Sequence, residues 1–176
     1  MYVFRPRKGV HTYIQAVKKV HFFSETPGFL PKNRLLLRQW ITQLFELHET
    51  KLLCVNYIFC TDAEILVINQ QYLNHDTFTD IITFDNTEDK NAGVESDIFI
   101  SVERTKENAE QYNCHKTTEL HRVMAHGALH LMGFKDKTKE QKAQMRTEEN
   151  KALLLLETLR GNTNTLKTKT TNDQRN

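Results

Sequence analysis

Apolar residues recur along this chain with two different periods, and the changes of period predict the elements of the fold. Short runs dominated by β-branched and aromatic residues are typical of strands. Such runs occupy residues 18–24, 52–60, 80–84 and 97–101. The run 52–60 is mostly apolar, as expected of a central strand that is covered on both faces. The pattern therefore predicts a sheet of about four strands.

Apolar residues three and four positions apart predict the helices. In residues 33–48 they form one face: Leu36, Leu37, Trp40, Ile41, Leu44 and Leu47. Capping residues mark the start of three further helices. Asp62 is expected to cap a helix through Tyr72, Ser101 a helix over 102–113, and Thr138 with Gln141 a last helix that ends near Arg160. Residues 118–132 form another helix, which carries histidines.

Strands that alternate with helices indicate an α/β or α+β fold in a single domain, with a small mixed sheet flanked by helices. Residues 1–17 are predicted to form a loose N-terminal extension, and residues 18–160 the folded domain. Residues 161–176 are rich in Asn, Thr and Lys and predict a disordered polar tail.

The composition is that of an ordinary globular protein: of 176 residues, 39% are hydrophobic and 26% are charged. The longest apolar run, Leu153 to Leu156, is far shorter than the roughly 18 residues of a membrane span, so no membrane association is expected. Three cysteines without a Cys-x-x-Cys pair favour a reducing cytoplasmic location, with all three as small buried hydrophobes.

Net charge gives no support to a nucleic-acid partner. The whole chain carries +2. Residues 1–20 carry +5 and residues 161–176 carry +2, so residues 21–160 carry −5. Nucleic-acid-binding domains are usually basic, and here only the two ends are.

The candidate chemistry lies in His126-Gly-Ala-Leu-His130-Leu-Met-Gly133-Phe-Lys-Asp136. Histidines four residues apart lie on the same face of a helix and can hold one metal ion between them. Gly133 suits the left-handed conformation that ends a helix, and Asp136 can then approach the ion from a second direction. Three ligands with an open fourth position are typical of a catalytic zinc, which lowers the pKa of bound water to about 7. A second interpretation of Asp136 is a cap for the helix that follows Thr138.

The residues around this motif narrow the chemistry. In zinc peptidases of the His-Glu-x-x-His type, the general base follows the first histidine. Here that position is Gly127, so peptidase activity is disfavoured. His121 lies about 140° around the helix from His126 and is not expected to share the metal.

Three segments in the same order resemble the YbeY family of bacterial ribosomal-RNA maturation factors. They are Val123 to Phe134, Asn69 to Phe84 with its Thr79-Asp80-Ile-Ile-Thr-Phe, and Ser96-Asp97-Ile-Phe-Ile-Ser101. Later, Met145-Arg146 with Glu148 or Glu149 also looks like the last helix of the family. The resemblance covers roughly residues 18–157.

The resemblance implies a zinc-dependent endoribonuclease, specific for single strands, that acts in 16S rRNA 3′-end maturation and in ribosome quality control. It implies one Zn²⁺ held by His126, His130 and Asp136 at a surface cleft. It also implies single-stranded rRNA and the small ribosomal subunit with its proteins as partners. The sequence leaves open whether water or the RNA 2′-hydroxyl is the nucleophile.

The chain departs from the family pattern at two positions. Asp136 stands where a third histidine is commonest, and its charge is expected to make bound water less acidic and to favour harder metals. Leu73 stands where many members have an arginine thought to contact RNA phosphate. Because leucine cannot bind phosphate, that contact is either absent or supplied by another group, for which His75, Arg122 and Lys135 are the candidates.

Two other functions stay open at this point. Leu73 and the acidic central region motivate a non-catalytic ribosome-assembly factor with a structural metal. The spacing of His126, His130 and Asp136 motivates a zinc peptidase, against which Gly127 argues.

Overall fold

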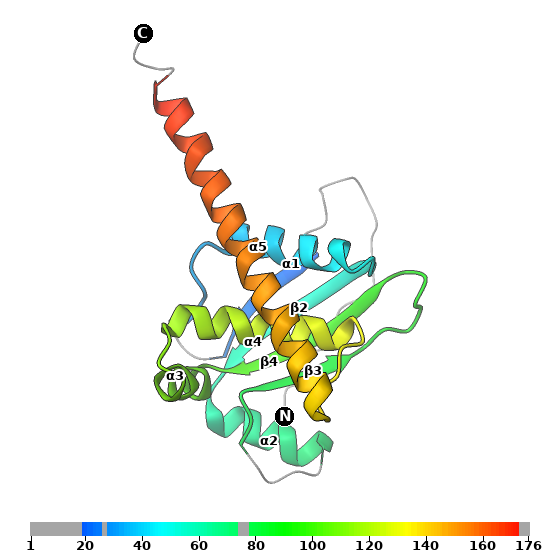
Figure 1. Ribbon diagram of the computed structural model, residues 1–176. Helices are drawn as coiled ribbons and strands as arrows, with labels where there is room; N and C mark the ends of the chain where they lie inside the picture. Colours follow the sequence, from blue (N-terminus) through cyan, green and yellow to red (C-terminus); the bar gives the residue numbers. More distant parts are fainter. Residues whose placement is uncertain (1–18, 26–27, 74–77, 173–176) are drawn as a thin grey trace.

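The fold is an α+β domain, as the sequence predicts (Figure 1). The computed structural model describes residues 19–25, 28–73 and 78–172. Its strands are β1 (Val20–Ser24), β2 (Leu52–Cys60), β3 (Ile81–Asp85) and β4 (Val94–Ser101). Its helices are α1 (Arg34–Leu47), α2 (Asp62–Leu73), α3 (Val102–Gln111), α4 (Lys116–Leu131) and α5 (Lys139–Asn172).

The four strands form one mixed sheet in the order β1-β2-β4-β3. β1 and β4 are both parallel to β2, whereas β3 is antiparallel to β4. Tyr57 of β2 lies between Phe22 of β1 and Ile98 of β4 in this register, and all three side chains are buried. β3 forms one edge of the sheet.

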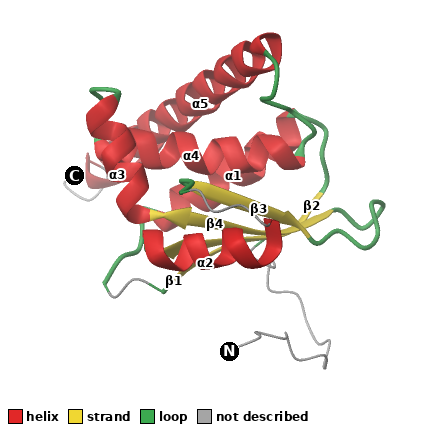
Figure 2. Cartoon of the chain, turned by 90° about the horizontal axis from the view of Figure 1, so that it is seen from below, coloured by secondary structure: helices red, strands yellow, loops and turns green. Residues whose placement is uncertain are grey.

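Helices cover both faces of the sheet (Figure 2). α1 and α4 pack on one face, and α5 packs against both of these helices. Together they enclose the main core, whose largest fully buried side chains include Trp40, Phe45, Tyr57, Phe59 and Met124. α2 lies on the opposite face, where Ile65 packs against Cys60 and Ile82. The Trp40 indole donates a hydrogen bond to the Ala152 carbonyl at 2.7 Å and so ties α1 to α5.

α4 packs closely on the sheet at Gly127. A Cβ atom at Gly127 would stand 2.7 Å from Cδ1 of Ile81 and 3.1 Å from Cγ2 of Ile98, closer than side chains pack. The Tyr57 hydroxyl, on β2, donates to the Met124 carbonyl at 3.0 Å. These contacts hold the middle of α4 over β3 and β4.

Most predicted boundaries agree with the structure, and the caps explain why. Ser101 accepts from the Arg104 amide at 3.0 Å, as predicted. Thr138 and Gln141 form the predicted capping box, in which the Gln141 amide donates to the Thr138 hydroxyl at 3.2 Å. The prediction that Asp62 caps α2 was wrong. Thr61 and Glu64 cap it instead, because Asp62 turns toward Ser101 and Arg104.

The end of α5 also differs from the prediction. We expected the helix to stop near Arg160, but it continues to Asn172. Gly161 does not end it, and no proline follows that would remove a backbone donor. Figure 1 shows this part of α5 projecting beyond the rest of the domain. The predicted N-terminal extension, residues 1–17, lies outside the described residues.

The structure can be compared with the predictions made for the cysteines and for membrane spans. All three cysteines are free, but only Cys60 is buried; Cys54 is half-buried and Cys114 is exposed, so the expectation of three buried thiols was wrong. Within residues 19–25, 28–73 and 78–172, no helix has the length and apolar character that a membrane crossing requires.

Candidate metal centre

The end of α4 brings the predicted ligands together. Gly133 adopts φ 93°, a left-handed conformation that favours glycine. The Gly133 amide donates to the His130 carbonyl at 3.0 Å, and the Phe134 amide donates to the Leu129 carbonyl at 3.1 Å. This helix end reverses the chain, as predicted, and returns Asp136 toward the histidines.

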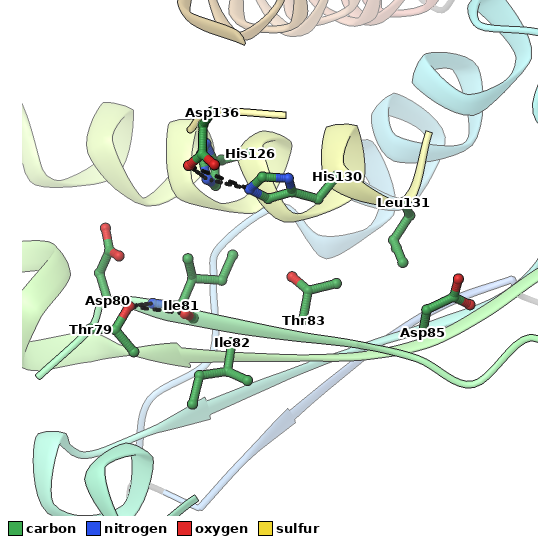
Figure 3. Close-up of a pocket in the computed structure, with 10 residues that line it drawn as sticks. All are labelled: Thr79, Asp80, Ile81, Ile82, Thr83, Asp85, His126, His130, Leu131 and Asp136. Atoms are coloured by element: carbon green, nitrogen blue, oxygen red, sulfur yellow. Dashed lines mark hydrogen bonds and ion pairs between the residues drawn. The ribbon is translucent and has the colours of Figure 1, made fainter. Parts of the chain in front are cut away.

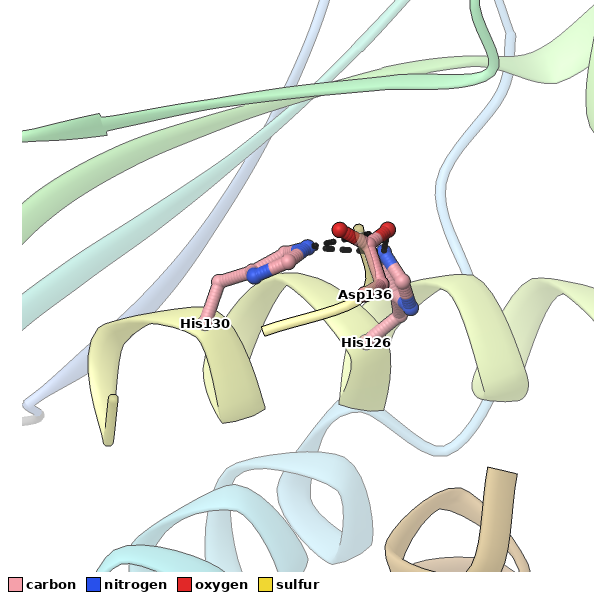
Figure 4. Close-up of side chains that lie close together, drawn as sticks. All are labelled: His126, His130 and Asp136. Atoms are coloured by element: carbon pink, nitrogen blue, oxygen red, sulfur yellow. Dashed lines mark hydrogen bonds and ion pairs between the residues drawn. The ribbon is translucent and has the colours of Figure 1, made fainter. Parts of the chain in front are cut away.

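His126, His130 and Asp136 converge on one point (Figure 4). The two Nε2 atoms are 2.9 Å apart, and each lies 3.7 Å from Oδ2 of Asp136. Asp136 is not the cap of α5, because Thr138 and Gln141 have that role. This group of three is the one set of histidine, cysteine and acidic residues with metal-binding geometry in the described part of the chain.

The hydrogen bonds behind the histidines determine which ring nitrogen faces the group. Nδ1 of His126 lies 2.9 Å from Oε1 of Glu149, and Nδ1 of His130 lies 2.9 Å from the Phe134 carbonyl. A carboxylate and a carbonyl can only accept, so each Nδ1 carries the hydrogen. When both rings are neutral, each Nε2 directs a lone pair at the other and at Asp136. Three acceptors converge, and a cation between them removes their repulsion.

The distances fit a tetrahedral zinc. With metal–ligand bonds of about 2.0–2.1 Å, the ligand atoms of a tetrahedron lie about 3.3–3.4 Å apart. The separations of 2.9, 3.7 and 3.7 Å bracket that value. The three side chains are only partly buried, with Asp136 42% exposed, so one side of the site is open. A structural zinc is usually closed by a fourth protein ligand.

Negative charges around His126 oppose the effect of burial on its pKa. Burial lowers the pKa of His126, but the hydrogen bond and charge of Glu149, with Asp136 and Asp80, outweigh it and leave the pKa raised. Burial raises the pKa of Glu149, whereas His126, Arg146 and Arg122 lower it and prevail. The two shifts agree: Glu149 is an ionised partner for His126.

A cleft of about 450 Å³ opens in front of the three residues (Figure 3). One wall is β3 with the segment before it, and the other is the end of α4 with Asp136. Its lining residues are Thr79, Asp80, Ile81, Ile82, Thr83, Asp85, His126, His130, Leu131 and Asp136. Asp80 is fixed by the Asn108 side chain, which donates to it at 3.0 Å. The cleft therefore has an acidic wall opposite the histidines.

The structure places the other predicted site residues away from this cleft. Arg122 faces α5, where its guanidinium donates to Asn150 at 2.8 Å and to Glu149 at 3.3 Å. Lys135 is exposed and, with Phe134, lines a separate hollow. His75 lies outside the described residues. His121 packs edge-on against Trp40, apart from the metal group, as expected.

Sequence reasoning missed the two groups that orient the histidines. The sequence motifs include Glu149 only within a segment that looks like the last helix of a family, although a stronger signal is present. Met145, Glu149, Ala152 and Leu156 share one buried face of α5, and a charged residue in an apolar stripe needs a partner. The Phe134 carbonyl is a backbone group and leaves no mark on the sequence.

Comparison with known proteins shows the family of this chain. A sequence model described as "Endoribonuclease YbeY" matches residues 30–157, a stretch that includes the three candidate ligands and Glu149. The chain belongs to the YbeY family. An Endoribonuclease YbeY from Cytophaga hutchinsonii is 44% identical over 136 residues, which are 77% of this chain and 94% of the relative.

Other YbeY relatives and a solved structure agree. An Endoribonuclease YbeY from Porphyromonas gingivalis is 40% identical over 138 residues, which cover 78% of this chain and 90% of the relative. The solution structure of TM1509 from Thermotoga maritima is 29% identical with a TM-score of 0.52, and the match covers 81% of this chain and 93% of that one. The YbeY match confirms the resemblance seen in the sequence, and the fold is shared.

Proposed function

We propose that this protein is a zinc-dependent endoribonuclease that cleaves single-stranded RNA, with 16S rRNA 3′-end maturation and ribosome quality control as its role. The observation that carries the proposal is the convergence of two Nε2 lone pairs and the Asp136 carboxylate at an open cleft. The names of its YbeY relatives support the reaction class. The small ribosomal subunit is then the partner, and the cytoplasm the location.

One Zn²⁺ per chain fits this donor set, with His126, His130 and Asp136 as its ligands. A zinc ion bound there would supply a Lewis acid for the scissile phosphate and for an attacking oxygen. The protein holds both imidazoles in the tautomer that zinc needs, through Glu149 and the Phe134 carbonyl. The β3 wall limits the approach of substrate to one side.

An open cleft at an edge strand suits a single strand better than a duplex. Side chains can reach the phosphates and unstacked bases of single-stranded RNA, which a duplex keeps less accessible. Among the proposed phosphate-binding residues, Lys135 remains available because it is exposed and adjoins Asp136 in the chain. Arg122 is less suited, since Glu149 and Asn150 already occupy its guanidinium.

The two alternative functions fit the site less well. A peptidase of the His-Glu-x-x-His type needs a glutamate at position 127, where even a Cβ atom would stand 2.7 Å from Ile81. An assembly factor with a structural metal is expected to close its zinc with a fourth ligand, whereas here the three candidate ligands border an open cleft.

The proposal is tested by cleavage of a 5′-labelled single strand that spans an rRNA 3′ end. We expect the protein to cut it, to lose activity after chelation and to regain activity with one equivalent of zinc. The same sequence annealed to its complement should resist cleavage. Cleavage that survives complete chelation would contradict a metal-dependent reaction, and equal cleavage of the duplex would contradict strand specificity.

A further inference from the structure

Glu149 connects the metal centre to two arginines. Its side chain is buried in α5, with 6% of the residue exposed. Oε1 lies 2.9 Å from Nδ1 of His126, while Oε2 lies 3.3 Å from Nη1 of Arg122 and 3.2 Å from Nη1 of Arg146. One oxygen thus serves the ligand, and the other serves the guanidinium groups.

This division of the two oxygens fixes the carboxylate in position. A buried carboxylate without partners costs several kcal/mol. Glu149 can therefore stay ionised beside His126 only because the two guanidinium groups pair with it. Arg122 is itself held, because its Nη1 donates to Asn150 at 2.8 Å and its Nε lies 3.8 Å from Glu119. The Arg146 side chain is 54% exposed and pairs with Glu149 from the solvent side.

The two histidine ligands are therefore oriented by different chemistry. His130 donates to a neutral backbone carbonyl of its own helix end. His126 donates to a charged side chain that comes from another helix, 23 residues further along the chain. A carboxylate behind an imidazole makes the ring a stronger ligand and fixes its tautomer more firmly than a carbonyl does.

We infer that Glu149 is a positioning residue for the metal centre, and that Arg122, Glu149 and Arg146 act as one unit that holds His126 with its Nε2 lone pair toward the metal. The inference rests on the proposed function in taking the bound metal to be the one the nuclease uses. It gives α5 a part in the site although no residue of α5 lines the cleft. It also gives Arg122 a task other than phosphate binding.

The test compares zinc affinity, measured by competition with a chromophoric chelator, for the wild type and Glu149→Gln. Glutamine keeps the size of the side chain and loses its charge. We expect zinc to bind 10- to 100-fold more weakly, roughly the usual effect of removing an outer-shell partner. Glu157→Gln is the matched control, because Glu157 lies on the same helix and pairs with Arg160 three residues away. It should bind zinc like the wild type.

A second variant keeps the inference open to refutation if Glu149→Gln does not fold, and a spectroscopic measurement adds an independent test. Arg146→Gln removes only the exposed partner, and a loss of several-fold is expected, with Arg160→Gln unchanged. In the metal-free protein, ¹⁵N NMR of the imidazoles should show His126 as the Nδ1–H tautomer. Folded Glu149→Gln should show a mixture.

Wild-type zinc affinity in both folded variants, with His126 still in one tautomer, would overturn the inference. RNA cleavage is scored separately. If the wild type binds zinc and cuts no RNA, the proposed function fails while the positioning of His126 by Glu149 stands. If the wild type cuts RNA and Glu149→Gln binds zinc normally, only the inference about Glu149 fails.

Discussion

Asp136 is a harder candidate ligand than an imidazole, and at 42% exposed it is also the most accessible of the three candidate ligands. Carboxylates suit manganese and magnesium better than imidazoles do, whereas histidine favours zinc. The substitution Asp136→His should therefore raise the ratio of zinc to manganese affinity, by about tenfold. Competition titrations of both metals measure it. An unchanged ratio would mean that Asp136 is not a ligand.

His121 lowers the free energy of unfolding at low pH, and this effect does not depend on the metal. Burial, with a smaller contribution from the charge of Arg160, lowers the pKa of His121 to about 4. The unfolded chain takes up this proton near the ordinary pKa of about 6.5, so stability falls as the pH drops from about 6.5 toward 4. Between pH 7.5 and 5.0 this one group should cost about 2 kcal/mol.

His121→Phe isolates that cost. Phenylalanine keeps an aromatic ring against Trp40 and cannot take up a proton. In urea unfolding at the two pH values, the wild type should lose about 2 kcal/mol more than the variant. Release of metal at low pH affects both proteins alike and cancels in the difference. Equal losses would show that His121 already has an ordinary pKa in the folded protein.

At the scale of elements, the contact between α4 and the sheet decides where the histidines lie. Gly127→Ala would place a methyl group 2.7 Å from Cδ1 of Ile81, which can turn aside, and 3.1 Å from Cγ2 of Ile98, where α4 or the sheet must shift by a few tenths of an ångström. We expect a loss of about 1–3 kcal/mol in the free energy of unfolding, the usual cost of overpacking, together with weaker zinc binding. Gly161→Ala, where a Cβ meets nothing within 4 Å, is the control and should be neutral or slightly stabilising.

If Gly127→Ala were as stable as Gly161→Ala, close packing of α4 would not be what positions the ligands. Denaturant unfolding of both variants, followed by zinc titration at a concentration where both are folded, separates the two effects.

The elements also show what the sequence can predict. β2 and α4 could be recognised because their apolar periods are strong, and Ser101 and Thr138 because caps are local. The start of α2 was assigned to the wrong cap because Asp62 has a better partner in Arg104, 42 residues away. The bond between Glu149 and His126 joins two helices, and the sequence pattern of either helix alone does not contain it.

At the scale of the whole molecule, negative charge lines the cleft and positive charge lies on the chain that follows α4. Asp80 and Asp85 lie on the β3 wall. The chain beyond Gly133 presents exposed lysines at positions 135, 137, 139 and 142. Because the described domain is acidic elsewhere, we expect the RNA backbone to approach from the lysine side, with its phosphates away from β3.

The dependence of RNA binding on salt tests this direction. Replacing Lys135 and Lys137 by alanine should reduce the slope of log K against log salt by about 1.4, roughly 0.7 for each phosphate that a lysine no longer neutralises. Lys90→Ala with Lys106→Ala removes the same charge from exposed positions elsewhere and should leave the slope nearly unchanged. Equal changes in both double variants would indicate a general charge effect without a defined path.

The central claim is that His126, His130 and Asp136 hold the metal that cleaves RNA. Its most direct test is cleavage of the labelled single-stranded rRNA fragment by the wild type and by folded His126→Ala, purified in parallel, with bound zinc measured on the same samples. His115→Ser is the control, because it changes the histidine that caps the same helix and replaces the capping ring nitrogen with a serine hydroxyl, which can also cap. We predict one zinc and cleavage for the wild type and the control, and neither for His126→Ala. Equal cleavage by all three proteins would contradict the account.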